Sequence, residues 1–173
     1  MLAQITPTIS LKSSKYLRTE RLRVPSQRIP IVVAALWPKN GLNLGTLGRT
    51  VDAVGAWMVT PSSSLASKAI RRGNTIGGCI PWETIDEDPY EWLAKHNCRK
   101  VAVELAHNST PISELNVYSG DTILVIGNEL HGIPNAALEL CDEAVEIPMS
   151  GVGNSLNVTV AASIVLYKLA GLT

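Results

Sequence analysis

The feature that most constrains this fold is an arrangement of strand, glycine loop and helix that occurs twice between residues 122 and 170. Apolar runs at 123–126 and 145–147 are each followed by a polar, glycine-bearing segment, at 127–132 and 150–155. Each segment leads into a helix-like stretch. In α/β proteins this arrangement brings loops together at one edge of a parallel sheet, where ligand clefts form. The pattern predicts a small-molecule site at that edge.

The rest of the chain also alternates between strand-like and helix-like segments. Strands are expected at 31–36, 57–60, 100–105, 122–126 and 145–147, and helices at 44–54, 64–72, 84–96, 134–141 and 155–169. Residues 108–115 are expected to form a loop with one helical turn. This order predicts an α/β fold with a mostly parallel sheet and helices on both faces.

Length and composition predict one domain at 30–173 with an arm at 1–29. The chain has 173 residues, of which 46% are hydrophobic, so it is long enough to bury a core. No apolar run approaches the ~18 residues of a membrane span. The cysteines (Cys79, Cys98 and Cys141) are odd in number and lack metal-ligand spacing. We therefore expect reduced thiols in a cytoplasmic protein, with no metal site.

Charge is unevenly distributed along a chain whose net charge is zero. Residues 1–30 hold six basic residues and one acidic residue, and the remainder holds nine basic and fourteen acidic residues. The six basic residues are Lys12, Lys15, Arg18, Arg21, Arg23 and Arg28. The arm, expected to be partly helical at 13–23, is either a contact for a polyanion or a tail that maintains solubility.

The segment 43–50, NLGTLGRT, lies at an expected strand-to-helix turn. Free N–H groups and the helix dipole attract anions there, and Asn43 can cap the helix. Arg49 offers a planar, five-donor group suited to phosphate. Taken alone, the segment is better explained as an ordinary capped helix with a surface arginine.

Two further segments follow the last two expected strands. Gly127, Asn128 and Glu129 suit the polar groups of a small ligand, or form a turn that caps the next helix. In the other segment, Ile147 and Met149 offer an apolar wall for a heterocycle. Ser155 and Asn157 then open the last helix. Core packing followed by a serine N-cap is the alternative for that segment.

In this order and spacing, the three segments resemble the SpoU (TrmH) family of SPOUT methyltransferases. The family's first motif, Asn-x-Gly-x-x-x-Arg-[Ser/Thr], matches residues 43–50. Its second, Gly-x-Glu-x-x-Gly after an apolar strand, matches 127–132. Its third, Ile-Pro-Met-x-Gly-x-x-x-Ser-Leu-Asn-Val-x-Val-Ala, matches 147–161 almost completely. The resemblance covers about residues 31–170.

The resemblance implies a fold whose carboxyl-terminal part threads through a loop to form a trefoil knot. It also implies that S-adenosylmethionine binds in that knot. The residues expected to contact this cofactor are Glu104, Leu105, Gly127, Asn128, Glu129, Ile147, Met149, Ser155 and Leu156.

For catalysis, the resemblance implies transfer of a methyl group to a ribose 2′-hydroxyl of RNA by a homodimer. Arg49 would reach a site completed by the partner subunit and hold phosphate or stabilise an alkoxide. Ser155 and Asn157 would orient the ribose and Arg49, with Asn43 in the same catalytic set and Glu129 in support. A guanidinium does not readily lose a proton, so Arg49 is not expected to be the base.

Transfer RNA is the expected substrate, and the surroundings of the first motif favour the guanosine branch. Relative to the family, the chain ends soon after Leu169, so RNA contact is expected to rest on the arm, the dimer surface and three basic residues, Lys68, Arg71 and Arg72. Ribosomal RNA is the alternative substrate, and an idle RNA-binding factor is the alternative function. A nucleotide-dependent oxidoreductase is disfavoured because no GxGxxG follows a strand.

Overall fold

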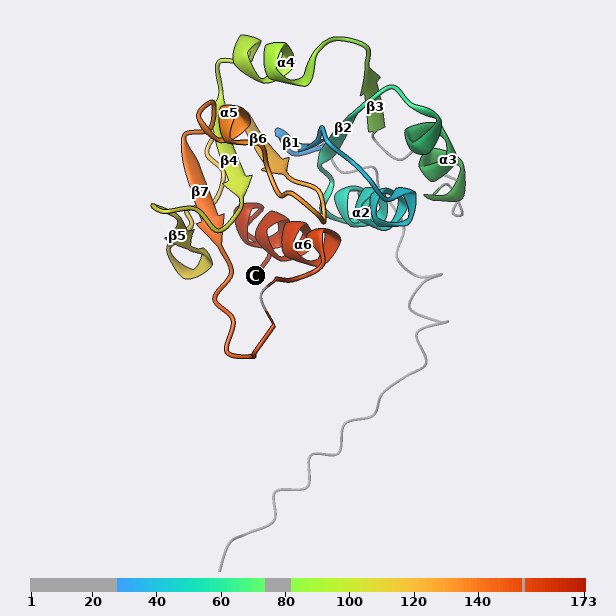
Figure 1. Cartoon of the computed structure of the whole chain (residues 1–173). Helices are drawn as coiled ribbons and strands as arrows, with labels where there is room; N and C mark the ends of the chain where they lie inside the picture. The colour runs from blue at the N-terminus through green and yellow to red at the C-terminus, as the bar shows by residue number, and fades with distance from the viewer. Residues whose placement is uncertain (1–27, 74–81, 154) are drawn as a thin grey trace, which may run out of the picture.

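A seven-stranded parallel sheet forms the centre of the protein (Figure 1). The computed structural model describes residues 28–73, 82–153 and 155–173. The strand order is β3-β2-β1-β6-β4-β7-β5, and every recorded pairing is parallel. The strands are β1 (Ile31–Ala35), β2 (Trp57–Pro61), β3 (Trp82–Ile85), β4 (Arg99–Val103), β5 (Thr110–Pro111), β6 (Thr122–Ile126) and β7 (Glu143–Glu146).

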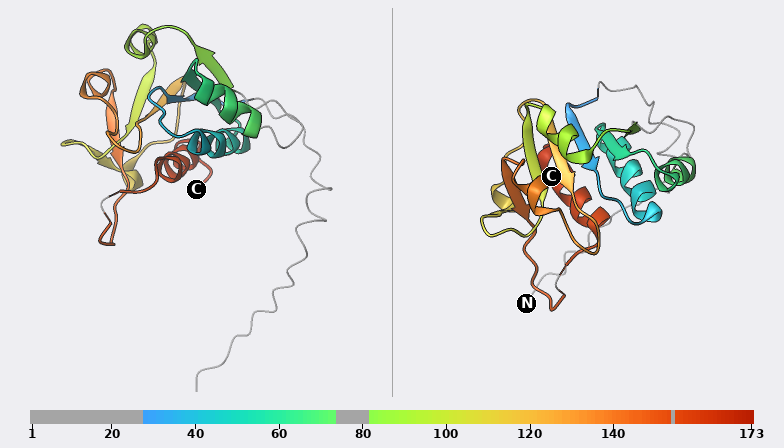
Figure 2. Two further views of the ribbon diagram at one scale, coloured as in Figure 1. Left: turned by 45° about the vertical axis from the view of Figure 1, so that its right-hand side comes forward. Right: turned by 45° about the horizontal axis from the view of Figure 1, so that its top comes forward.

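Helices cover both faces of the sheet, as predicted (Figures 1 and 2). One apolar cluster joins the sheet to α2 (Gly41–Val54), α3 (Ser64–Gly73) and α6 (Val158–Leu169). The other joins it to α4 (Pro89–Lys95) and α5 (Asn135–Leu138). Successive residues of a strand face opposite sides, so Val33 belongs to the first cluster and Ala34 to the second. No described helix is both long and apolar enough to cross a membrane.

The expected strands and helices are present, with ends that differ by a few residues, except at β5, where a loop was expected, and in the segment from 82 to 96. That segment was expected to be one helix over 84–96, but it contains β3 followed by the shorter α4. Asp88 caps α4 by accepting hydrogen bonds from the backbone N–H groups of Tyr90 and Glu91, and Pro89 occupies its first turn. The signal for a helix beginning at 89 was therefore present in the sequence.

Two helix starts also differ from expectation. Helix α2 begins at Gly41, and Asn40 caps it by accepting from Leu42 N at 2.9 Å. Asn43 is therefore inside the first turn and is not the cap. Helix α6 begins at Val158 with Asn157 as its cap, so Ser155 lies before the helix and does not open it.

Three adjacent strands end in register at one edge of the sheet. Val103 of β4 pairs with Ile126 of β6 on one side and with Val145 of β7 on the other. The residues just beyond these pairs, Glu104 and Gly127 among them, therefore emerge side by side. This register brings the predicted loops to a common edge.

Candidate active site

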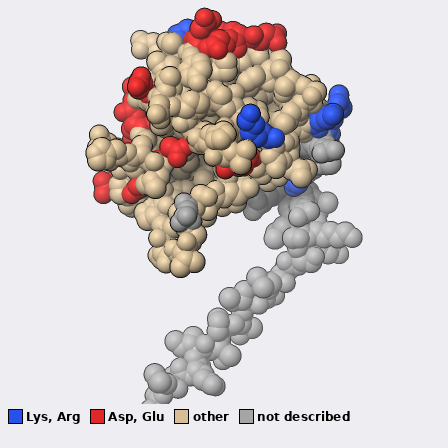
Figure 3. Space-filling model, in the orientation of Figure 1, with Lys and Arg blue, Asp and Glu red and all other residues tan. Residues whose placement is uncertain are grey.

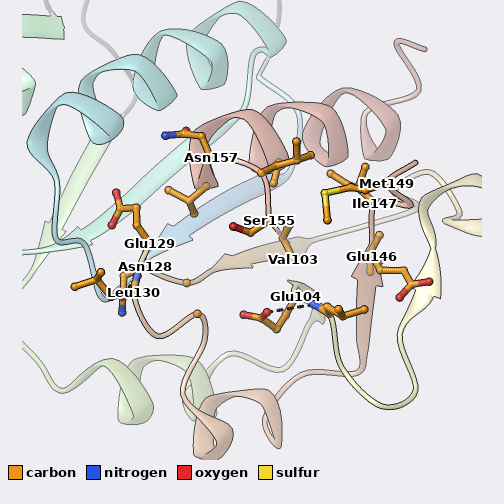
Figure 4. Close-up of a pocket in the computed structure, with 17 residues that line it drawn as sticks. Val103, Glu104, Asn128, Glu129, Leu130, Glu146, Ile147, Met149, Ser155 and Asn157 are labelled. Carbon is orange, nitrogen blue, oxygen red and sulfur yellow. Dashed lines mark hydrogen bonds between the residues drawn. The ribbon is translucent and has the colours of Figure 1, made fainter. Parts of the chain in front are cut away.

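A cavity of about 540 Å³ opens at this carboxyl edge, between the ends of β4, β6 and β7 and the start of α6 (Figure 4). It brings together all nine residues expected to contact a cofactor, including Glu104, Leu105, Met149 and Leu156. Leu105, Met149 and Leu156 are 72%, 43% and 39% exposed, so apolar walls face solvent here. A pocket of this size with apolar walls and a few polar groups is typical of a small-molecule site.

The loop after β6 is folded back on itself and forms part of the cavity lining. Asn128 and Gly132 exchange two backbone hydrogen bonds, at 3.1 and 3.0 Å. The Asn128 side chain accepts from the N–H groups of Leu130 and His131, at 3.0 and 2.9 Å. A Cβ on Gly127 would overlap the backbone of Gly132, so only glycine fits there. Asn128 thus stabilises its own loop and does not cap α5, because Pro134 precedes that helix.

Three predicted catalytic side chains form one hydrogen-bonded group beside the cavity. The Asn43 amide donates to the Glu129 carboxylate, and Asn157 Nδ2 donates to Asn43 Oδ1 at 3.2 Å. Asn157 Oδ1 accepts from Thr159 N at 2.9 Å, which fixes the amide orientation. Thr159 Oγ1 donates to the Asn43 carbonyl at 3.1 Å. We call Asn43, Glu129 and Asn157 the polar triad; it joins α2, the loop after β6 and the start of α6.

Arg49 and Ser155 lie outside this group. Arg49 is exposed on α2 and is not among the residues lining the cavity. It follows Asn43 by six residues, which places it about 120° away around the helix. Ser155 lines the cavity and is exposed. Within one chain, the structure therefore does not bring Arg49 to the polar triad.

The predicted RNA-binding residues are only partly described. Lys68 and Arg71 are exposed on α3. Lys and Arg side chains gather on the part of the surface formed by α3, whereas Asp and Glu gather near α4 (Figure 3). Arg72 belongs to α3 as well. Lys12, Lys15, Arg18, Arg21 and Arg23 lie outside the described residues, as does the expected helix at 13–23.

Several cavity residues were not predicted. They are Val103, Leu130, Val145, Glu146, Val158 and Ala161, whereas Gly132 belongs to the candidate loop at 127–132. Glu146 was within reach of sequence reasoning, because it follows Val145 at the end of an expected strand. Thr159, which bonds to Asn43, carried no separate signal. Among the described residues, no group of three or more His, Cys, Asp or Glu side chains is placed to hold a metal ion.

The fold and the cavity together define an α/β domain that binds a small ligand at the carboxyl ends of its parallel strands. Residues 30–167 match the SpoU rRNA Methylase family. The chain therefore belongs to this family.

Individual relatives agree with this assignment. The chain is 33% identical over 158 residues to the tRNA (guanosine(18)-2′-O)-methyltransferase of Aquifex aeolicus, covering 87% of this chain and 74% of that enzyme. The crystal structure of the A. aeolicus TrmH/SpoU tRNA modifying enzyme matches with a TM-score of 0.72 at 30% identity, covering 92% of this chain and 84% of that one.

A third relative is the rRNA methyltransferase from Sinorhizobium meliloti, whose crystal structure has AdoMet (S-adenosylmethionine) bound. It matches with a TM-score of 0.68 at 27% identity and covers 80% of this chain. This chain spans 55% of the length of that structure.

Proposed function

We propose that this protein transfers a methyl group from S-adenosylmethionine to a ribose 2′-hydroxyl of RNA, and that tRNA is its substrate. The observation that carries the proposal is the cavity at the carboxyl edge, with the polar triad directly beside it. Membership of an RNA methylase family and the tRNA activity of the A. aeolicus relative support the choice of reaction and substrate.

The residues present fit the proposed cofactor. The apolar side chains of Leu105, Ile147 and Leu156 suit an adenine ring, and backbone groups of the loop at 127–132 are available for polar contacts. When bound, S-adenosylmethionine would supply a methyl group on a sulfonium: the ribose oxygen would attack the methyl carbon in line, the C–S bond would break with S-adenosylhomocysteine as the leaving group, and the hydroxyl proton would pass to the neighbouring phosphate. Holding the methyl carbon and the ribose oxygen in line contributes much of the rate.

On the RNA side, the polar triad orients the ribose. Asn157 is fixed at both ends of its amide, by Asn43 and by the first turn of α6, so its geometry is set before substrate arrives. Arg49 then stabilises the developing alkoxide or the adjacent phosphate, because a guanidinium keeps its charge at neutral pH. Ser155, at the mouth of the cavity, contacts the ribose.

Arg49 reaches this site from a partner subunit in a homodimer. Support comes from its exposure on α2, away from the triad of its own chain. Helix α6, which packs against α2, also presents an apolar outer side: Val160 and Ile164 are 47% and 41% exposed. A hollow of about 500 Å³ lies beside them, lined by Ile112 and Tyr167 among others. A second copy covers this surface.

A subunit-mixing experiment tests the contribution of Arg49 in trans. Arg49→Ala and Leu156→Asp, each made alone, should lose methyl transfer, the second because a charge in the apolar wall of the cavity would be desolvated by the bound cofactor and so blocks its binding. Mixed dimers should recover activity, since one of their two sites combines an intact cavity with the partner's arginine. No recovery after verified subunit exchange would place Arg49 in its own chain's site.

We also propose that the chain is knotted, with residues 104–121 passing around α6. The support is that this segment packs against α6. Leu115 packs in the same apolar cluster as Leu166, and Tyr118 N donates to Leu169 O at 2.8 Å. A crystal structure tests the threading; a connection lying entirely on one side of α6 would contradict it.

The RNA surface extends over α3 and the amino-terminal arm. Exposed Lys68 and Arg71 support this, and the acidic surface near α4 is the side RNA avoids. Lys68→Ala with Arg71→Ala should reduce the slope of log affinity against log salt by about 2. Deleting residues 1–27 should flatten it further; an unchanged slope would leave the arm as a solubility tail.

The reaction itself is tested by incubation with methyl-labelled S-adenosylmethionine and separated tRNA and rRNA fractions. We expect label in tRNA, recovered as a nuclease-resistant dinucleotide, because a 2′-O-methyl group blocks cleavage at the next bond. Label confined to rRNA would show that rRNA, and not tRNA, is the substrate. Cofactor and RNA binding without transfer would indicate an RNA-binding factor on the same fold.

A further inference from the structure

Glu104, the first residue after β4, directs its carboxylate at the backbone around the cavity (Figure 4). Oε2 accepts a hydrogen bond from Ile133 N at 2.9 Å, and Oε1 accepts from Leu105 N at 3.2 Å. Ile133 is buried, at 4% exposure. Glu104 therefore joins the end of one strand to the loop that follows its neighbour, and backbone N–H groups occupy both of its oxygens.

Gly132 and Glu104 fit only as a pair. Gly132 has a φ of 63°, a conformation that favours glycine. A Cβ at this position would also overlap Oε2 of Glu104. The space that the missing side chain leaves is therefore filled by the carboxylate. Because Gly132 in turn packs against Gly127, the two glycines and Glu104 set the path of the loop.

The same loop connects the cavity with the polar triad. Asn128 and Gly132 close it by mutual hydrogen bonds, and Glu129 at its tip accepts from Asn43. A displacement of the loop at Gly132 therefore moves cavity lining and triad together. Glu104 is the side chain from a neighbouring strand that holds it.

We propose that Glu104 is a positioning residue for methyl transfer, which fixes the loop at 127–133 in the conformation that receives the methyl donor. This inference rests on the proposed function. Glu104 acts by holding the loop, and its carboxylate does not contact the ligand directly. Loss of the carboxylate leaves the Ile133 N–H unpaired, so the loop relaxes to recover a hydrogen bond with water.

Glu146 provides a matched control. It is also a glutamate that lines the cavity, at the end of β7, but its carboxylate accepts from the Ser109 hydroxyl at 2.8 Å and makes no recorded hydrogen bond to the loop. Glu104→Ala and Glu146→Ala each remove one negative charge from the cavity wall. A difference between the two variants therefore measures the loop contact and not the charge.

Titration calorimetry with S-adenosylmethionine tests the proposal on the full chain. Glu104→Ala should raise Kd about 10- to 100-fold, the range of a lost charge-assisted hydrogen bond. Glu146→Ala, which removes the same charge but no contact with the loop, should raise Kd less and should leave amide exchange at Ile133 unchanged. Glu104→Gln, which keeps one acceptor, should restore part of the loss. Amide exchange at Ile133 should accelerate in Glu104→Ala while the melting temperature changes little.

Equal effects of Glu104→Ala and Glu146→Ala would overturn the proposal in favour of a charge effect. If Glu104→Ala does not fold, Glu104→Asp, whose carboxylate is drawn back from Ile133, replaces it with the same expectations. Gly132→Ala should weaken binding in the wild type and by less in the Glu104→Ala background, where the overlap is gone and only the strain of the positive φ remains. Failure of the wild type to bind S-adenosylmethionine would instead refute the proposed function.

Discussion

The two edges of the sheet carry cavities of nearly equal volume but opposite character. At the amino edge, a cavity of about 510 Å³ is lined by residues that include Arg28, Trp57, Trp92 and His96. Arg28 is already paired within the protein, because it donates to Asp52 and to the Ala56 carbonyl and lies 5.5 Å from the Trp57 ring centroid. His96 Nδ1 lies 2.6 Å from the Trp92 carbonyl oxygen.

At the carboxyl edge, a cavity of about 540 Å³ is lined by exposed apolar side chains and a glycine loop, with the polar triad beside it. The difference shows that volume does not identify a functional site. What distinguishes the carboxyl edge is several exposed apolar side chains next to polar side chains whose orientation is already fixed, whereas the exposed Trp57 ring of the amino edge already packs with Arg28. The amino edge stabilises the fold, and the following substitutions test this division.

The largest effect is expected for Gly127→Ala. The added methyl group overlaps the Gly132 backbone, so the loop at 127–133 must move. Overpacking of this kind costs about 1–3 kcal/mol, which corresponds to about a 10- to 100-fold rise in the Kd for S-adenosylmethionine. Gly120→Ala is the control, because no atom lies within 4 Å of a Cβ there. Equal donor affinity in both variants would contradict the role of the loop.

Asn157→Asp separates the two roles of Asn157, which caps α6 and donates a hydrogen bond to Asn43. Aspartate keeps the acceptor for Thr159 N but lacks the amide that donates to Asn43. We expect methyl transfer to fall by about 10-fold or more while thermal stability is retained. Asn157→Ala should lose both, with about 1 kcal/mol of stability. Full activity of Asn157→Asp would exclude the triad from the mechanism.

Comparison of sequence with structure explains which parts of this site were predictable. The strand ends and their loops followed from local pattern, because alternation of apolar runs and glycine segments reports the edge of a parallel sheet. The pairing of Asn43 with Asn157, 114 residues apart, depends on how α2 and α6 pack. No local pattern reports that packing, so the triad was foreseen only through the family motifs. The local pattern had instead suggested that Asn43 caps α2, a role that Asn40 fills.

The prediction of a single helix over 84–96 was wrong for a different physical reason. Trp82–Ile85 is a short edge strand with partly exposed side chains, so it lacks the apolar run of a buried strand. Its pairing with β2 fixes it as a strand, and the Trp82 indole donates to Thr60 Oγ1 at 2.9 Å. Those contacts come from the neighbouring strand and are absent from the local sequence.

At the amino edge, Arg28→Ala should affect stability alone. Its partly exposed ion pair with Asp52 and its contact with Trp57 contribute about 1 kcal/mol together. We expect denaturant unfolding to show this loss, with the Kd for S-adenosylmethionine unchanged. Arg28→Lys, which keeps the charge but not the planar group, should lie in between. A large rise in the Kd of Arg28→Ala for S-adenosylmethionine would show that the amino edge also affects the functional site.

The smallest effect concerns Cys141, which lies after α5 and outside both glycine loops. Burial, reinforced by Asp142, raises the pKa of the Cys141 thiol from 9.0 to about 11. The folded state therefore holds the proton more tightly than the unfolded state does. The stabilisation is complete below pH 9 and is lost as the pH rises through 11. Between pH 8.5 and 10.5, the wild type should lose slightly more stability than Cys141→Ala, measured by denaturant unfolding. Parallel pH profiles would show that the thiol proton does not contribute.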